Sequence, residues 1–184
     1  NNRVFGNTIK NHHVGIWALY YSEGNFFFHN NFVNNTRQFS VSGTIWNNSV
    51  AENYWSDYDG IDANNDGIGD ASYRIDGNVQ DEQPLMGMSH YFNTSLGYQV
   101  NVITNSTVED FEYSESNSTI RLYVSNATAN QTYGFCRIAI PDALMPPPYT
   151  VKINNTQVLY DIVETDEINT IYFNYKHSKL EIII

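Results

Sequence analysis

Closely spaced oxygen-bearing side chains between residues 53 and 70 restrict the fold of this chain more than any other feature. Asp62, Asn64 and Asp66 stand at every second position, and Gly67 follows them. This is the first half of an EF-hand-type calcium loop, in which oxygen ligands occupy loop positions 1, 3 and 5 and a glycine at position 6 makes the sharp turn. The pattern therefore predicts a Ca²⁺ site.

The rest of the loop departs from the EF-hand pattern. Loop position 12 is Tyr73 instead of a bidentate glutamate, and no helical pattern flanks the loop. The remaining ligands must therefore come from nearby residues. The predicted ligand set is Asp57, Asp59, Asp62, Asn64, Asp66, the backbone carbonyl of Ile68, and Asp70, with Asp76, Asp81 and Glu82 as secondary candidates.

A surface turn without metal is the alternative interpretation, because Asn, Asp and Gly favour turns by themselves. However, five carboxylates lie within the fourteen residues from Asp57 to Asp70, and they repel one another unless a cation lies between them. We therefore expect a bound cation, with a structural role and not a catalytic one.

The composition is acidic and typical of a folded protein. Hydrophobic residues make up 41% and aromatic residues 15% of the chain, and 20 Asp and Glu against 9 Lys and Arg give a net charge of -11. This charge argues against nucleic acid and anionic membranes as partners. No apolar run approaches the roughly 20 residues of a membrane span. The first residue is Asn1, which is consistent with a processed or partial chain.

Cysteine usage adds little, because Cys136 stands alone and no intrachain disulfide can form. Its apolar neighbours predict a small buried side chain and not a nucleophile.

Sequons for N-glycosylation are frequent, at about twice the roughly four that the composition gives by chance. They predict export and a surface that carries sugars, although an Asn-rich composition also inflates their number. The sequons begin at Asn34, Asn47, Asn93, Asn105, Asn117, Asn126, Asn130 and Asn154.

Short apolar runs separated by asparagine fill residues 1–50. The pattern that begins at Gly6-Asn7 returns at Gly24-Asn25. Such runs predict a parallel β-helix, in which coils stack, inward side chains form a continuous core, and asparagine takes the left-handed backbone of tight corners. About two coils fit, fewer than the roughly three repeats that a solenoid needs to be stable alone.

The next residues carry a family resemblance. Asn53–Tyr58 (Asn-Tyr-Trp-Ser-Asp-Tyr), the Asp/Asn loop, Tyr73–Asp76 and Asp81–Met86 follow one another in this order. With the Asn-rich coils, they resemble the end of the right-handed β-helix of NosD-like surface proteins of the archaeal type, over residues 1–88 or so. The resemblance implies an exported β-helix that ends in a metal-stabilised loop, and it carries the copper-related name of the family.

Three other roles are compatible with a β-helix. Copper could be held by thioether and imidazole groups, for which Met86, Met88 and His90 are the candidates. A polysaccharide lyase or hydrolase would need clustered carboxylates or bases along a longer groove, and the basic residues here are scattered. A polysaccharide-binding module would stack sugars on aromatic rings, for which the candidates are Trp17, Trp46, Tyr54, Trp55 and Tyr58.

From Gly97 onward the pattern changes to alternating strands with turn signals roughly every 8–12 residues, as in a β-sandwich. Residues 89–96 are expected to form a connector, and Pro146-Pro147-Pro148 a rigid loop outside the sheets. The run Tyr133–Pro141 resembles Ig-like modules of archaeal surface proteins, which implies no chemistry. The predicted strands are 98–104, 108–113, 118–124, 135–140, 149–153, 158–163, 170–175 and 180–184.

The predicted fold class is therefore all-β, with a short right-handed parallel β-helix closed by a calcium loop in residues 1–90 and an Ig-like antiparallel β-sandwich in residues 91–184. No nucleophile–base pair or phosphate loop emerges, so we expect no enzyme.

The leading hypothesis is an N-glycosylated structural protein of the cell surface or extracellular space, a subunit of a cell-surface layer or of a linear filament in which copies assemble head to tail. The apolar segment 179–184 is expected to complete either its own sheet or a neighbour's by strand addition, with calcium stiffening the domain junction or the subunit contact.

Overall fold

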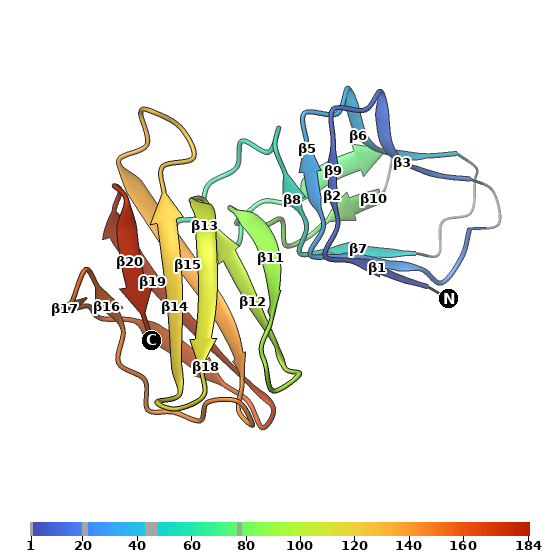
Figure 1. The fold of residues 1–184 in the computed structure, drawn as a ribbon. Coiled ribbons are helices and arrows are strands. Elements are labelled where there is room, and N and C mark those ends of the chain that lie inside the picture. The colour runs from blue at the N-terminus through green and yellow to red at the C-terminus, as the bar shows by residue number, and fades with distance from the viewer. Residues whose placement is uncertain (1, 20–21, 43–47, 77–78) are drawn as a thin grey trace. The chain divides into compact units, whose positions relative to one another are not determined.

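The computed structural model describes residues 2–19, 22–42, 48–76 and 79–184 (Figure 1). Within these ranges the chain forms twenty β-strands and no helix, which confirms the all-β class. The chain divides into two compact units, Asn1–Ser89 and His90–Ile184. None of the described residues forms a helix that could cross a membrane.

Parallel strands in the first unit recur every 23 residues, as the pairing of Arg3 with Phe26 and of Thr8 with Asn31 shows. Successive segments of the chain therefore stack on one another in register. The three sheets consist of β1 (Arg3–Phe5), β4 (Phe26–Phe28) and β7 (Ser49–Ala51); of β2 (Thr8–Lys10), β5 (Asn31–Val33) and β8 (Tyr54–Trp55); and of β3 (Val14–Ala18) and β6 (Arg37–Val41). An antiparallel pair follows, β9 (Tyr73–Asp76) with β10 (Val79–Asp81).

The repeat differs from the one that the glycine–asparagine pairs indicated. Asn7 is hydrogen-bonded to Asn30, whereas Asn25 is hydrogen-bonded to Asn2. The two Gly-Asn pairs mark different corners of the coil, so matching them aligned unlike positions.

In the coils, left-handed backbone occurs at Gly24, with a φ of 69°, and at two corners that recur in successive coils. One lies at Gly6, His29 and Glu52, with φ of 67°, 51° and 54°, and the other at Asn11 and Asn34, with φ of 61° and 53°. The prediction of asparagine at such corners is thus right for the second corner only. At the first corner, His29 Nε2 and Glu52 Oε2 lie 2.8 Å apart, a contact that offsets part of the cost of this backbone in non-glycine residues.

The core between the sheets is aromatic in its later coils. Ile9, Phe32 and Trp55 occupy equivalent inward positions in successive coils. The rings of Phe32 and Trp55 stack with their centroids 4.4 Å apart, and the ring of Tyr73 stacks on Trp55 at the same distance. The stacking continues the hydrophobic column from β5 through β8 into β9.

A buried column of asparagines accompanies this core. The backbone N–H and the side-chain amide of Asn7 both donate to Asn30 Oδ1, at 3.2 and 3.0 Å. Asn30 repeats both hydrogen bonds to Asn53 Oδ1, each at 3.0 Å. Asn30 and Asn53 are fully buried, so each amide replaces its lost water contacts with protein partners.

The second unit consists of two five-stranded sheets around one core. Fully buried side chains from both sheets belong to that core, among them Val102, Leu122, Ile138 and Ile182. One sheet has the order β11 (Met88–Asn93), β12 (Gln99–Thr104), β15 (Tyr133–Pro141), β19 (Ile168–Lys176) and β18 (Asp161–Glu164); the other has the order β13 (Thr107–Ser114), β14 (Thr119–Ser125), β20 (Leu180–Ile183), β16 (Lys152–Ile153) and β17 (Thr156–Gln157).

Three expectations for this unit need correction. The expected connector 89–96 contains most of β11. Phe92 in this strand packs against the core, and its ring centroid lies 4.5 Å from that of Phe111. Of the expected strand 149–153, only residues 152–153 form a strand, β16, because prolines just before a segment disfavour pairing in a sheet. The expected strand 158–163 begins later, as β18 at Asp161, and residues 158–160 lie outside any strand.

The terminal strand β20 completes a sheet of its own chain. It pairs with β14 on one side and with β16 on the other (Figure 1). The backbone of Ile184 continues this pairing through reciprocal hydrogen bonds with Ile120, at 2.9 and 3.0 Å.

We expect Asn30→Ala to lower the free energy of unfolding by about 3 kcal/mol, because it leaves buried partners in two neighbouring coils without hydrogen bonds. Asn30 Nδ2 also donates to the carbonyls of Val4 and Phe28, at 2.8 and 3.1 Å. Urea denaturation measures the change. Asn25→Ala is the matched control, since Asn25 donates the same pair of hydrogen bonds, to Asn48 Oδ1, in a less buried column. This substitution should lower the free energy of unfolding by about 1 kcal/mol. Equal losses in the two variants would contradict a special role of the buried column.

Candidate metal centre

Backbone N–H groups order the carboxylates of the predicted calcium loop. Asp62 accepts hydrogen bonds from the N–H groups of Asp66 and Gly67, at 3.0 and 2.9 Å. Asp66 accepts one from the N–H of Ile68 at 2.8 Å. Gly67 has a φ of 84°, so the glycine supplies the left-handed turn that the sequence pattern predicts.

The other two predicted side-chain ligands belong to the same hydrogen-bonded loop. Asn64 Oδ1 accepts from the N–H of Asp66 at 3.2 Å, and Asn64 Nδ2 donates to Asp66 Oδ2 at 3.0 Å. Asp70 Oδ2 accepts from the N–H of Ala63 at 2.8 Å. The structure thus links Asp62, Asn64 and Asp66 by hydrogen bonds, and Asp70 binds the backbone of the same loop.

Tyr58 holds the loop from its inner side. Its hydroxyl donates to the carbonyl of Ala71 at 2.6 Å. A Cβ added to Gly60 or to Gly69 would lie 2.1 or 2.2 Å from the same hydroxyl oxygen, so the tyrosine side chain occupies space that only glycine leaves free on both sides. Partial burial raises the pKa of Tyr58, and the Asp70 and Asp59 carboxylates add to this shift.

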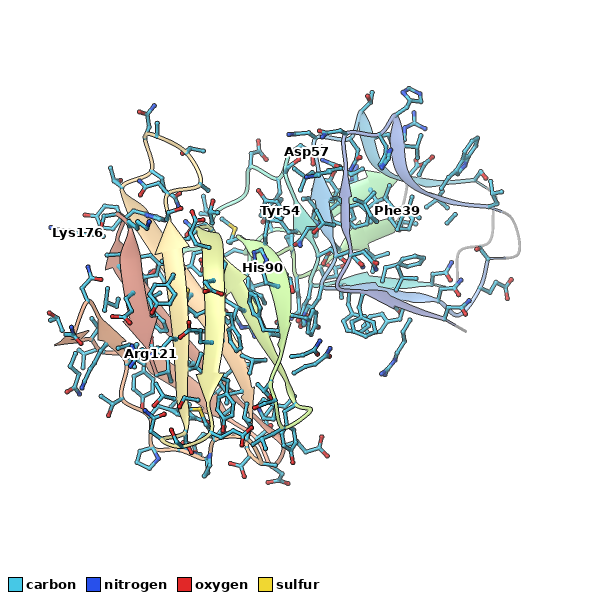
Figure 2. All side chains as sticks on the ribbon, viewed as in Figure 1. Phe39, Tyr54, Asp57, His90, Arg121 and Lys176 are labelled. Atoms are coloured by element: carbon cyan, nitrogen blue, oxygen red, sulfur yellow. The ribbon has the colours of Figure 1, made fainter. Side chains whose placement is uncertain are left out.

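Asp57, labelled in Figure 2, has partners outside the loop. Its carboxylate accepts hydrogen bonds from Gln38 Nε2 at 3.0 Å and from the Tyr73 hydroxyl at 3.1 Å. Burial, followed by the nearby Asp57 carboxylate, raises the pKa of Tyr73. Asp57 therefore binds the side of the stacked coils, while Asp59 is exposed to solvent.

The donor chemistry of the loop fits a hard cation in part. Oxygen atoms dominate it, and neither of the ion pairs found among the described residues neutralises a loop carboxylate. Nevertheless, no three carboxylate, imidazole or thiol groups converge there, or elsewhere in the described ranges, in a way that could hold a metal. Neutral oxygens, those of Asn64 and of backbone carbonyls such as that of Ile68, would have to complete the coordination.

Asp81, expected only as a secondary ligand, has a role that the sequence did not reveal. Its Oδ1 accepts from the N–H groups of Glu52 and Gln83, each at 3.0 Å. Its Oδ2 accepts from the N–H of Asn53 at 2.9 Å, from the Asn53 amide at 3.2 Å and from Trp55 Nε1 at 3.0 Å. The fully buried carboxylate thus ends the asparagine column.

The candidate copper ligands Met86, Met88 and His90 flank the division between the two units. Met88 and His90 occupy alternate positions of β11, so their side chains leave the strand on one side. His90 Nε2 is buried without a hydrogen-bond partner among the described residues, and burial lowers the pKa of this imidazole (Figure 2).

The candidate sugar-stacking residues differ in exposure. Trp55 is 1% exposed and donates to Asp81, so it is a core residue and not a platform. Tyr54 and Tyr58 are half-buried. Trp17 is 63% exposed, and Trp46 lies outside the described residues.

The predicted glycosylation sites also divide by environment. The Asn105 amide donates to the Tyr133 carbonyl, and the Asn126 amide donates to the Gln131 carbonyl; both asparagines are half-buried. A glycan would replace one of the two hydrogens on the amide nitrogen and leave the other to donate. Asn47 lies outside the described residues, and the exposed sequons are Asn34, Asn93, Asn117, Asn130 and Asn154.

A polar cluster inside the second unit was not anticipated. The Ser106 hydroxyl lies 2.6 Å from the Tyr175 hydroxyl and 2.7 Å from His177 Nε2. Cys136 Sγ lies 3.5 Å from the same tyrosine oxygen, and burial raises the pKa of this thiol to about 11. Ser106 is 5% exposed and Cys136 is fully buried, so these groups bind one another inside the sandwich.

Similarity to known proteins covers part of this chain. Residues 1–60 match the family described as periplasmic copper-binding protein (NosD). Two curated relatives bear the description "probable ABC transporter binding protein NosD". The one from Stutzerimonas stutzeri is 43% identical over 81 residues, or 40% of this chain and 19% of the relative. The one from Pseudomonas aeruginosa is 36% identical over 81 residues, or 42% of this chain and 19% of the relative.

The match is therefore local, because the chain spans about a fifth of the length of these relatives, 19% in each case. No solved structure matches the chain. The family match over residues 1–60 supports the expected resemblance of the coils to NosD-like proteins.

We expect Asp81→Asn to lower the free energy of unfolding by about 3 kcal/mol, although it changes neither shape nor volume. An amide nitrogen in place of one carboxylate oxygen would face N–H donors instead of accepting from them. Thermal or urea unfolding measures the loss. Glu82→Gln at the exposed neighbouring position is the control and should change stability by less than about 0.5 kcal/mol. A neutral result for Asp81→Asn would contradict the assigned capping role.

Proposed function

We propose that this chain is a non-catalytic structural module of an exported, cell-surface or extracellular protein. In this proposal the first unit is a short right-handed parallel β-helix of the NosD-like kind, as in archaeal surface proteins. A calcium loop closes that unit, and the second unit is an Ig-like β-sandwich.

The observation that carries the proposal is the asparagine column with its aspartate end. The polar side chains of this column hydrogen-bond each coil to the next, from Asn7 through Asn30 and Asn53 to Asp81. Groups that are fully hydrogen-bonded inside a core specify a structure and have no capacity left for substrate. This use of polar residues is what a rigid scaffold requires.

Calcium is proposed for the loop because its carboxylates have no cationic partner in the described structure. The ion would be held by Asp62, Asn64, Asp66 and Asp70 and by the Ile68 carbonyl, and it would neutralise their charge. Asp57 is a weaker member of the proposed set, since Gln38 and Tyr73 already bind its carboxylate.

Export and glycosylation are proposed together. The family that matches residues 1–60 is described as periplasmic, and five of the eight sequons are exposed in the described structure. The two half-buried sequons, Asn105 and Asn126, are less accessible to a glycosylating enzyme than the five exposed ones.

Assembly into a filament is the last part of the proposal, and the pairing of β20 limits which strands could contact another copy. β20 is paired on both sides within its own sheet, so segment 180–184 is not a donor strand. Contacts between copies would have to use other surfaces, such as the outer strands of the sheets.

Calcium should raise the melting temperature of the purified chain, and a chelator should reverse the rise. The physical reason is that an ion bound only to the folded state stabilises it by RT ln(1 + [L]/Kd), about 2.7 kcal/mol at a hundredfold excess over Kd. Asp62→Asn should reduce the calcium-dependent rise, whereas Asp161→Asn at an exposed position of β18 should preserve it. Identical melting curves with calcium and with chelator, together with no heat of binding by calorimetry, would refute the calcium site.

Negative-stain electron microscopy tests the assembly of the same material. Linear particles that grow with protein concentration are expected for a filament subunit. Monomers at all concentrations, with and without calcium, would remove the filament from the proposal.

A further inference from the structure

Strands β3 and β6 are parallel neighbours in the first unit (Figure 1). A hollow of about 300 Å³ lies beside them. None of its residues belongs to the calcium loop or to the asparagine column. Its lining consists of His13, Val14, Trp17, Thr36, Arg37 and Ser40. The hollow therefore combines one large aromatic ring with a guanidinium, an imidazole and two hydroxyl groups.

Trp17 is the unusual member of this set. Its side chain is 63% exposed, although it projects from a regular strand, and the other described tryptophan, Trp55, is 1% exposed. The residue in register with Trp17 on the next coil is Ser40. Because serine is short, the neighbouring coil leaves the indole uncovered, as a flat apolar surface next to polar groups.

Arg37 places positive charge beside this surface in a chain whose net charge is -11. Its Nη1 donates to Ser40 Oγ at 3.3 Å, and neither of the ion pairs in the described part of the chain involves it. A guanidinium carries five N–H donors in a planar fork, so most of them remain available to a ligand. The exposed His13 adds a further donor in the same hollow.

The two strands hold these groups at a fixed separation. The N–H of Arg37 donates to the His13 carbonyl at 3.0 Å, and the N–H of Thr36 donates to the His12 carbonyl at 2.9 Å. At Gly15 the strands approach so closely that a Cβ would lie 2.3 Å from the Gln38 carbonyl oxygen. The backbone under the hollow is therefore preorganised, which lowers the entropic cost of binding.

We propose that this hollow binds a uronic acid residue of an anionic polysaccharide. The apolar face of the pyranose ring stacks on the Trp17 indole, and the carboxylate pairs with the Arg37 guanidinium, which matches carboxylate geometry. The Thr36 and His13 side chains are placed to bind ring hydroxyls. The volume is at the lower end for ligand pockets, which suits one or two sugar residues. A neutral sugar would leave the arginine charge unused, so the ligand is anionic.

The test is titration of the full chain with tetragalacturonic acid in the presence of a chelator. The chelator removes calcium-mediated contacts, so the result is independent of the calcium loop and of the structural role. We expect saturable binding by calorimetry, weakened at least tenfold by Trp17→Ala and by Arg37→Gln. The fully methyl-esterified tetrasaccharide keeps the shape but loses the charge, and it should also bind at least tenfold more weakly.

Two exposed residues outside the hollow serve as matched controls. Tyr98→Ala removes an exposed aromatic side chain of the second unit, and Arg74→Gln removes an exposed charge of β9; both should leave binding unchanged. Circular dichroism and the melting temperature verify that all variants fold, which their exposure predicts. Absence of binding to the native chain, equal affinity for the methyl ester, or retained affinity in both hollow variants would each overturn the proposal.

Discussion

Each coil of the first unit depends on an asparagine amide that finds its partner one coil later. Apolar side chains alone tolerate small shifts between stacked coils, because Ile9, Phe32 and Trp55 can slide against one another at little cost. The amides do not, since a shift would bury a polar group without a partner. The hydrogen bonds from Asn7 to Asn30 and from Asn30 to Asn53 therefore fix the register, and the ring stacking follows from it.

Patterns local in sequence predicted most of the fold. The strand predicted at 118–124 from its alternating apolar residues corresponds to β14, Thr119–Ser125. The strand predicted at 170–175 lies within β19, Ile168–Lys176. Asn-rich apolar runs predicted the parallel coils, and the asparagine corners at Asn11 and Asn34 were right. In each case the signal comes from backbone preference or from burial of every second residue, which neighbouring residues determine.

Features that depend on distant partners escaped prediction. The 23-residue repeat was hidden because similar Gly-Asn pairs mark two different corners. The role of Asp81 depends on donors from Glu52 to Trp55, and no spacing rule connects them. In the loop, the sequence pattern predicted Asp62 and Asp66 as calcium ligands. The pattern could not show that backbone N–H groups already donate to the oxygens of these two residues. Fewer oxygen lone pairs therefore remain to coordinate a cation.

The end of the asparagine column has an evolutionary consequence. An asparagine both accepts and donates, so it can be followed by another, whereas the Asp81 carboxylate only accepts and passes nothing on. If one whole 23-residue coil before Asp81 were duplicated or deleted, the hydrogen bonds along the asparagine column would keep the same donors and acceptors. The scaffold can thus change its length in steps of one coil through simple gene rearrangement, while a single acidic position keeps marking the terminus.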